Sequence, residues 1–235
     1  MRALLLAAGY GSRLKPITNY VPKCLVEING RPLLDYWLTL LEGSEITEVL
    51  INLHYLGGRV EDFIKRSNYQ LQIELVNEEK LLGTGGTIQE NMSWFKKEPT
   101  LVIHADNLSL FSMERFLQTF WTRGPDIEIT MMTFITETPR TCGILEIDER
   151  GIVRALYEKV DDPPGKLANG AVYIFSSNVL EYIKMLSKPN LDISLDVLPH
   201  FIGKINTYHN DVYHRDIGNV ESLQIAQKEY PMAGL

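Results

Sequence analysis

The chain has 235 residues, 45% of them hydrophobic and 23% charged, a composition that excludes a disordered protein and suits one globular domain. Its net charge of -7 is opposite to the usual balance of a nucleic-acid-binding protein, and no stretch reaches the ~18 apolar residues of a membrane span. We therefore expect neither nucleic acid nor a membrane as a partner. Cys24 and Cys142 form no disulfide framework, which predicts reduced thiols in a cytoplasmic protein.

In the first half of the chain, short apolar runs alternate with segments of helical spacing. The N-terminal run is too short for the core of a signal peptide, and we interpret it as a buried first strand. Short strands separated by helices predict a parallel sheet that is covered on both faces. The expected strands are Ala3–Ala7, Val49–Leu53, Leu71–Val76 and Leu101–His104, and the expected helices are Leu33–Leu41 and Val60–Ile64.

After Asp126 the pattern changes to strands with shorter connections. The segment from Asp148 to Gly151 has the composition of a hairpin turn between two of them. The strands expected in this half are Ile127–Phe134, Cys142–Ile147, Ile152–Tyr157, Ala171–Phe175, Lys204–Tyr208 and Asp211–Arg215. The helices expected here are Val179–Leu186, Ile193–Phe201 and Val220–Tyr230.

These elements predict an α/β protein: a single Rossmann-like domain over residues 1–235, with a mostly parallel mixed sheet flanked by helices. Ligands of such sheets bind at the carboxyl ends of the strands. The loops after residues 7, 53, 76 and 104 are therefore where we expect the functional residues.

The segment that follows the first strand is rich in glycine and positive charge. It contains Gly9, Gly11, Arg13 and Lys15, and Lys23 follows after a proline. Glycines allow backbone amides to approach phosphate oxygens, and Arg can bind a phosphate through two hydrogen bonds. A dinucleotide-binding loop would need Gly or Ala at Leu14, and a Walker A loop would need Gly-Lys followed by Ser or Thr. A tight turn with incidental charge is the remaining alternative, and the ordered series of basic residues disfavours it.

The pattern Gly-x-Gly-Ser-Arg-Leu-x-Pro, followed by Pro22-Lys23, resembles the sugar-1-phosphate nucleotidyltransferases. The members most similar in outline are the short mannose and heptose 1-phosphate guanylyltransferases and N-acetylmuramate 1-phosphate uridylyltransferase. The resemblance continues in family order to the end of the chain, through Leu82–Gly86, Asp106, Glu158-Lys159, Asn169-Gly170 and Asp216–Gly218.

The resemblance implies a GT-A-like nucleotidyltransferase fold, with the nucleotide held by about residues 1–125 and the sugar phosphate by about residues 126–235. It implies no left-handed β-helix, because the chain stops soon after the helix expected to end near Tyr230.

The reaction implied by the resemblance joins a nucleoside triphosphate to a sugar 1-phosphate and releases pyrophosphate. Its nucleophile is already an anion, so it needs charge neutralisation and alignment rather than a general base. The resemblance gives catalytic roles to Arg13, Lys23 and Asp106, with Arg13 at the β- and γ-phosphates. The residues expected to bind the nucleotide are Leu6, Ala7, Ala8, Gly9, Gly11, Ser12, Arg13, Lys23, Gly83, Thr84 and Gly85.

The same resemblance implies a Mg²⁺ cofactor held by Asp106 and Asp216, since Mg²⁺ prefers carboxylate, phosphate and water oxygens. Either aspartate alone would suit a strand-end cap equally well. Two departures from the family pattern lie nearby: Ala105 stands where Gly is common, and Cys24 stands where Pro is usual. We expect His104 to be a packed side chain rather than a metal ligand.

For the sugar phosphate, the resemblance implies binding by Gly143, Glu158, Lys159 and Asn169. The alternative for Glu158 and Lys159 is an exposed ion pair of little energetic value. The chain also reads Gly170-Ala171 where the family often has Ala-Gly, so the contacts of Ala171 are open.

The base, the sugar and the oligomeric state are not fixed by the sequence, and a homo-oligomer is among the options. The Gly-Thr-Gly-Gly form of residues 83–86 favours a mannose- or heptose-type guanylyltransferase over a uridylyl- or thymidylyltransferase. A glycosyltransferase of similar fold would usually carry an Asp-x-Asp motif, which residues 104–108 lack. A non-catalytic nucleotide-sugar-binding regulatory protein would be expected to lack Arg13, Lys23 or one aspartate.

Overall fold

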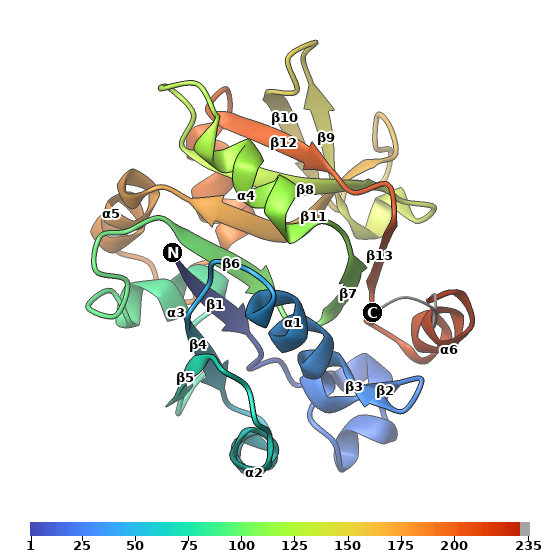
Figure 1. Ribbon diagram of the computed structural model, residues 1–235. Helices are drawn as coiled ribbons and strands as arrows, with labels where there is room; N and C mark the ends of the chain where they lie inside the picture. The colour runs from blue at the N-terminus through green and yellow to red at the C-terminus, as the bar shows by residue number, and fades with distance from the viewer. Residues whose placement is uncertain (231–235) are drawn as a thin grey trace.

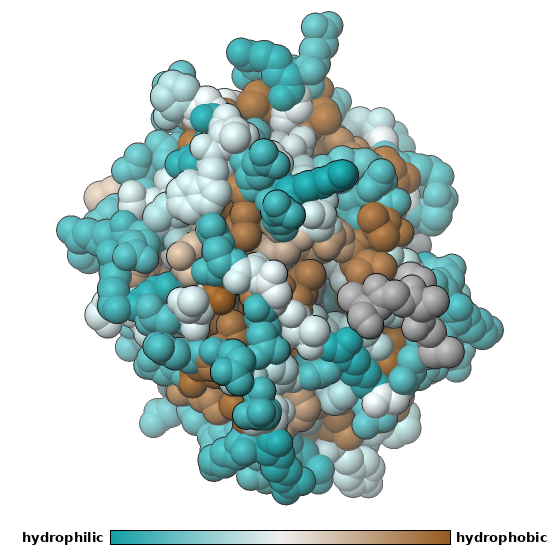
Figure 2. Space-filling model, viewed as in Figure 1, coloured by the Kyte–Doolittle hydropathy of each residue, from teal (hydrophilic) through white to brown (hydrophobic). Residues whose placement is uncertain are grey.

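The computed structural model describes residues 1–230, and the last five residues of the domain expected over 1–235 lie outside them. Within the described residues, no helix is both long and apolar enough to span a bilayer. On the face shown in Figure 2, polar and charged residues are interspersed with small groups of hydrophobic ones, as on an ordinary globular surface.

The first half of the chain forms the parallel part of a nine-stranded sheet (Figure 1). Each neighbouring pair in this part runs parallel, so all four strands point their carboxyl ends toward the same edge. The apolar runs of the first strands predict this arrangement because a parallel sheet buries both of its faces. In spatial order the strands are β6 (Thr100–His104), β1 (Arg2–Leu6), β4 (Glu48–Leu53) and β5 (Gln72–Asn77).

The second half extends the same sheet with mainly antiparallel strands. β11 (Leu167–Phe175) pairs with β6 and with β8 (Ile129–Ile135), and it contacts β9 at one register position. β12 (Ile205–His209) lies parallel to β8. β9 (Gly143–Ile147) and β10 (Val153–Glu158) form the hairpin expected around residues 148–151. The expected mixed α/β sheet flanked by helices is confirmed.

Helices cover both faces of the sheet and define two hydrophobic cores. One core contains α1 (Leu33–Glu42), α2 (Gly57–Arg66) and α4 (Met113–Trp121), with alternate side chains of β1, β4 and β6. The opposite core contains α3 (Thr84–Glu90), α5 (Ser177–Met185) and residues 191–201.

A third, smaller core lies beside the sheet and supports two short strands. β7 (Asn107–Leu110) and β13 (Tyr213–Asp216) pair antiparallel, with Asp216 opposite Asn107. α6 (Val220–Glu229) and the hairpin of β2 (Glu27–Ile28) and β3 (Arg31–Pro32) lie next to them. The buried residues of this small core are Leu14, Val26, Ile28, Leu33, Leu108, Ile217, Leu223, Ala226 and Tyr230.

The structure corrects the sequence predictions at several elements. The helix predicted over Ile193–Phe201 is wrong: this segment is a π-helical turn, Ile193–Val197, followed by a 3-10 turn, Leu198–Phe201. Pro199 removes a backbone donor that a regular helix would use there. β11 begins four residues before the expected Ala171, and β2, β3, β7 and α4 were not predicted.

Phe116 tests the assignment of α4 as a core helix. It is fully buried in the first core, so Phe116→Ala is expected to lower the free energy of unfolding by about 3–5 kcal/mol, as for other buried aromatic truncations. The measurement is urea denaturation followed by circular dichroism. Gln118→Ala, at an exposed position of the same helix, is the control and should stay within about 0.5 kcal/mol of the parent. Equal effects of the two substitutions would contradict the burial of this face.

Candidate active site

A pocket of about 220 Å³ opens at the carboxyl ends of the parallel strands. The topology explains its position, since the loops that follow β1, β4, β5 and β6 all emerge at this edge. Eight of the residues predicted from the sequence meet there: Leu6, Ala7, Ala8, Gly9, Lys23, Gly83, Thr84 and Asp106. The remaining lining residues are Cys24, Asn52, Glu78, Leu81, Thr87, His104 and Ala105.

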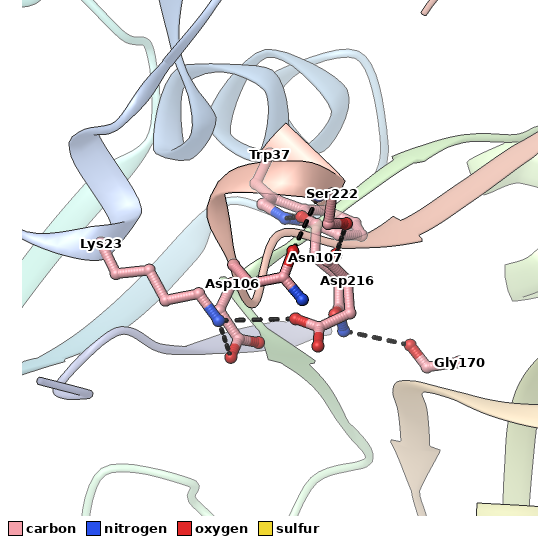
Figure 3. A network of polar contacts seen from close by, with 8 residues as sticks. Lys23, Trp37, Asp106, Asn107, Gly170, Asp216 and Ser222 are labelled. Carbon is pink, nitrogen blue, oxygen red and sulfur yellow. Dashed lines mark hydrogen bonds and ion pairs between the residues drawn. The ribbon is translucent and has the colours of Figure 1, made fainter. Parts of the chain in front are cut away.

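At one end of the pocket, Lys23 joins the two aspartates that are 110 residues apart in sequence (Figure 3). Its Nζ donates to Asp106 Oδ2 at 2.7 Å and to Asp216 Oδ1 at 3.4 Å. The lysine side chain is only 9% exposed, whereas the two carboxylates are 42% and 52% exposed. One nearly buried ammonium thus bridges two carboxylates, of which Asp106 lines the pocket and Asp216 lies behind it in contact with Lys23.

The pairing of β7 with β13 explains why the two aspartates meet. Asp106 immediately precedes β7, Asp216 ends β13, and the Ile217 amide donates to the Asp106 carbonyl at 3.1 Å. Trp37 of α1 donates from Nε1 to the Asn107 carbonyl at 2.7 Å, and this contact fixes the start of β7 against the main domain.

Arg13 lies beside the same cluster, and Gly218 shows how closely. A Cβ at residue 218 would lie 2.6 Å from Asp216 Oδ2 and 3.1 Å from Arg13 Nη2. A side chain at this position would therefore displace the carboxylate or the guanidinium. Arg13 belongs to the 3-10 turn Ser12–Leu14, which follows Gly11 in the left-handed region at φ 62°. Gly11 and Ser12 adjoin the pocket in sequence but do not line it.

The shared ammonium perturbs the two carboxylates in opposite directions. Loss of surrounding water would by itself raise the pKa of Asp106. Attraction to Lys23 and His104 outweighs this effect and lowers the pKa of the carboxyl. At Asp216 the loss of water prevails over attraction to Lys23, and repulsion from Asp106 adds to it, so the pKa is raised. Asp106 is therefore the more firmly anionic member of the pair.

A polar network that the sequence analysis missed lines the other end of the pocket. The Asn52 amide donates to Glu78 Oε1 at 2.8 Å and to Thr87 Oγ1 at 3.0 Å, and its Oδ1 accepts from the Ala7 amide at 2.8 Å. Thr87 also donates to Glu78, which is only 8% exposed. The signal for Asn52 and Glu78 was their place at the ends of β4 and β5, where ligand-binding side chains gather, whereas Thr87 lies in the first turn of α3.

His54 connects this network to the glycine-rich segment. Its Nδ1 is hydrogen-bonded to the Glu78 carbonyl at 2.7 Å and its Nε2 to the Tyr10 hydroxyl at 2.9 Å. The tip of the loop after β1 is thereby tied to the end of β5.

The glycine-rich entry to α3 has one side that lines the pocket and one side that packs against residues 190–191. Gly83 and Thr84 line the pocket, but the structure does not bring Gly85 into it. The Gly85 amide donates to the Leu191 carbonyl at 2.8 Å, and a Cβ there would contact the Leu191 side chain at 2.9 Å. Gly83 has φ 82°, and its Cβ would lie 2.5 Å from the same carbonyl. Close packing against residues 190–191 therefore accounts for Gly83 and Gly85.

The residues predicted for the sugar phosphate gather on β9, β10 and β11. A Cβ on Gly143 would lie 2.6 Å from Glu158 Oε2, so the Glu158 carboxylate lies directly over this glycine. Lys159 forms an ion pair with Glu158 at 3.2 Å and is largely exposed. The Asn169 amide donates to the Tyr173 hydroxyl at 2.8 Å, and its oxygen accepts from the Ala171 amide at 2.9 Å.

A bulge in β11 links this group to the aspartate pair. The register of β11 against β8 shifts between Asn169 and Tyr173, and Ala171 adopts φ 53° inside the bulge. Asn107 donates to the Gly170 carbonyl at 3.4 Å, so the bulge contacts the start of β7 (Figure 3).

The donor set at Asp106 and Asp216 fits a magnesium ion. Mg²⁺ is usually bound by one or two carboxylates, with phosphate and water oxygens completing an octahedron. In the part of the chain that the structure describes, no group of three or more His, Cys, Asp or Glu side chains could hold a metal. An ion held by these two carboxylates would thus take its other oxygens from a ligand and from water.

Comparison with solved structures defines the class of fold. A putative glucose-1-phosphate thymidylyltransferase from Bacillus anthracis superposes with a TM-score of 0.91 at 22% identity, over 100% of this chain and 97% of that one. HddC from Yersinia pseudotuberculosis, solved in complex with GMP-PN, gives a TM-score of 0.80 at 25% identity, over 98% and 99% of the two chains. The fold is that of the sugar-phosphate nucleotidyltransferases.

The chain belongs to the Nucleotidyl transferase family, whose model matches residues 2–232. A mannose-1-phosphate guanylyltransferase of Mycobacterium tuberculosis is 30% identical over 94% of this chain and 62% of the relative. A glucose-1-phosphate thymidylyltransferase of Streptomyces griseus is 28% identical over 95% of the chain and 64% of the relative. The chain spans about three-fifths of the length of these curated relatives.

Cys24, which follows Lys23 and lines the pocket, is expected to be unreactive. It is 1% exposed, and burial raises the pKa of its thiol to about 12, so almost none is thiolate at pH 8. Cys142 is half-buried and should react. Titration of the native protein with Ellman's reagent at pH 8 should therefore show one accessible thiol, and titration in guanidinium should show two. Two rapidly reacting thiols in the native protein would contradict the packing of the segment that carries Lys23.

Proposed function

We propose that the protein catalyses Mg²⁺-dependent transfer of a nucleotidyl group from GTP to mannose 1-phosphate or a heptose 1-phosphate, giving a GDP-sugar and pyrophosphate. The observation that carries this proposal is the convergence of Lys23, Asp106 and Asp216 at one end of a pocket whose walls come from the predicted nucleotide-binding segments. Family membership and the guanylyltransferase relatives support the same reaction.

In the proposed reaction, a phosphate oxygen of the sugar 1-phosphate attacks the α-phosphorus of the triphosphate. A new P–O bond forms there while the bond to the β-phosphate oxygen breaks, and that electron pair leaves with pyrophosphate. The phosphate is already an anion, so no residue has to remove a proton. A magnesium ion held by Asp106 and Asp216 would supply charge neutralisation and orient the phosphate oxygens.

The chain's basic residues would hold the phosphates in line. Arg13, next to the carboxylate pair, would bind the β- and γ-phosphates through its planar guanidinium and stabilise the departing charge. Lys23 would reach the α-phosphate or the incoming sugar phosphate. Backbone amides of Gly9, Gly11 and Ser12 would complete the contacts to the leaving group.

The topology supports a nucleotide position along the carboxyl edge of the sheet. Asp106 follows β6 and Glu78 follows β5, and these strands are three steps apart in the order β6-β1-β4-β5. At about 4.8 Å per step the two sites are separated by about 14 Å, a span that suits a nucleotide lying with its phosphates at Asp106 and its base near Glu78.

Glu78 supports guanine as the base. A carboxylate accepts hydrogen bonds only, and guanine presents two adjacent donors, N1–H and the N2 amino group, which match it. Uracil and thymine offer one donor, N3–H, flanked by two carbonyl oxygens, so only one carboxylate oxygen would find a donor and the other would face an acceptor. The thymidylyltransferase relative keeps thymidylyl or uridylyl transfer as the second candidate.

On the sugar side, Glu158 would accept hydrogen bonds from sugar hydroxyls and Lys159 would meet the sugar phosphate. The position of the Glu158 carboxylate directly over Gly143 supports this assignment. Asn169, next to the bulge that contacts Asn107, would line the same subsite.

The charged cluster is tested by turnover. We expect pyrophosphate release from Mg²⁺, GTP and mannose or heptose 1-phosphate, and Asp106→Asn and Arg13→Ala should each lower turnover by at least ~100-fold, as for removal of one preorganised charge. Arg150→Ala, in the exposed turn between β9 and β10, is the matched control for Arg13→Ala and should keep parent activity. No pyrophosphate from any nucleoside triphosphate and sugar 1-phosphate would remove the enzyme proposal and favour a regulatory protein, and transfer from a nucleotide-sugar would favour a glycosyltransferase.

The role of Glu78 is tested by base selectivity. Glu78→Gln keeps the shape and one acceptor oxygen but presents an amide donor, so the ratio of kcat/KM for GTP to that for UTP or dTTP should fall at least tenfold, the effect of about 1.5 kcal/mol for one charged hydrogen bond. The neighbouring exposed Glu79→Gln is the control and should leave the ratio unchanged. An unaltered ratio in Glu78→Gln would assign Glu78 to loop support alone.

A further inference from the structure

The Lys23 ammonium occupies the space between the two carboxylates that an ion would need. Its Nζ lies 2.7 Å from Asp106 Oδ2 and 3.4 Å from Asp216 Oδ1, so one positive charge already bridges both side chains (Figure 3). An ion that binds these same two oxygens lies about 2.0–2.1 Å from each of them, in the gap that Nζ now bridges. The ammonium and such an ion would therefore compete for one position.

Packing holds Lys23 in this bridging position. Its side chain is 9% exposed and its residue begins the 3-10 turn Lys23–Leu25, whose backbone is closed by hydrogen bonds from Leu25 to Pro22 and from Val26 to Lys23. The backbone is thus fixed, and the four-carbon stem is the part that can redirect the charge. Because Lys23 also lines the pocket, the same stem gives its ammonium access to a bound phosphate.

Arg13 does not duplicate this role. Lys23 contacts Asp216 Oδ1, whereas Arg13 lies near Oδ2 on the side of Gly218. Arg13 also has no ion pair with Asp106 among the described residues. Lys23 is the cation that joins both carboxylates.

We propose that Lys23 is the internal counter-ion of the metal-free site, and that metal binding requires its ammonium to move from the carboxylates to the substrate phosphates. This inference rests on the proposed function, because it takes the phosphate ligand and the divalent ion from that reaction. A bound triphosphate offers Lys23 a new partner and frees the carboxylates, so nucleotide and metal assist each other's binding through one side chain. By linkage, the assistance is equal in both directions.

The test is metal binding without nucleotide and without turnover. Mn²⁺ serves as the probe, and free Mn²⁺ is measured by electron paramagnetic resonance during titration of the protein. Lys23→Met keeps the length and packing of the side chain but removes the competing charge, so it should bind Mn²⁺ about tenfold more tightly than the parent, within the usual range of coupling between sites. Lys23→Arg, which keeps a cation, should bind as weakly as the parent.

Two further variants separate this site from other acidic positions. Lys188→Met removes the ammonium of a surface ion pair with Asp196 and should leave Mn²⁺ affinity unchanged. In the double variant Lys23→Met/Asp216→Asn, the gain in affinity should disappear. A parallel thermal-denaturation series should show a larger Mn²⁺-dependent rise in Tm for Lys23→Met than for the parent, since metal binding to the native state raises stability.

Lys23→Met that binds Mn²⁺ no more tightly than the parent, or not at all, would overturn the inference. Failure of this inference can be told apart from failure of the proposed function. An active enzyme whose Lys23→Met variant has unchanged Mn²⁺ affinity would refute only the role of Lys23 as counter-ion. A protein inactive with every nucleoside triphosphate would instead refute the reaction.

Discussion

The antiparallel pairing of β7 with β13 is the constraint on which the candidate active site depends. It sets Asp216 opposite Asn107, and therefore beside Asp106, across a large separation in sequence. A slip of one residue in this register would turn the Asp216 side chain to the other face of the ribbon. A two-stranded ribbon is barely stable by itself. Its integrity comes from the third hydrophobic core and from the contact of Trp37 with the Asn107 carbonyl, so apolar packing beside the sheet maintains the charge arrangement in the pocket.

The two ends of the pocket are built on different physical grounds. At the Asp106 end, one nearly buried ammonium holds two carboxylates that remain about half exposed. At the Glu78 end, a nearly buried carboxylate is held by neutral donors from Asn52, Thr87 and the Leu82 amide. His54 joins this second group to Tyr10, so the Glu78 end is tied to the loop after β1.

β1, β4 and β6 were predictable because they are buried on both faces and form continuous apolar runs, whereas β5, at the edge of the sheet, was predictable from its alternating pattern. β2, β3 and β7 were not, since they contain two to four residues and their pairing depends on tertiary contacts. α4 left a readable signal in the spacing of Met113, Phe116, Leu117 and Phe120, which the sequence analysis did not use. The segment 193–201 has the hydrophobic spacing of a helix but an irregular backbone. Hydrophobic spacing indicates which side chains are buried and does not determine the backbone hydrogen bonds.

For the site, residue order in the family pattern found Arg13, Lys23, Asp106 and Asp216, and their proximity could be known only from the fold. Asn52, Glu78 and Thr87 belong to no motif and were missed, although their positions near strand and helix ends are where ligand contacts gather. Gly85 shows the opposite error: a glycine in a recognisable motif serves packing against Leu191 rather than the pocket.

The direct pairing of β6 with β11 joins the parallel and antiparallel halves into one uninterrupted sheet. Continuous main-chain hydrogen bonding across this boundary holds the two halves in a fixed relation. In the proposed reaction, different sugars would therefore be accommodated by side-chain rotation and by the segments that rim the edge. Differences in sugar preference between related proteins would then come from different side chains on the same backbone, and not from a different degree of domain closure.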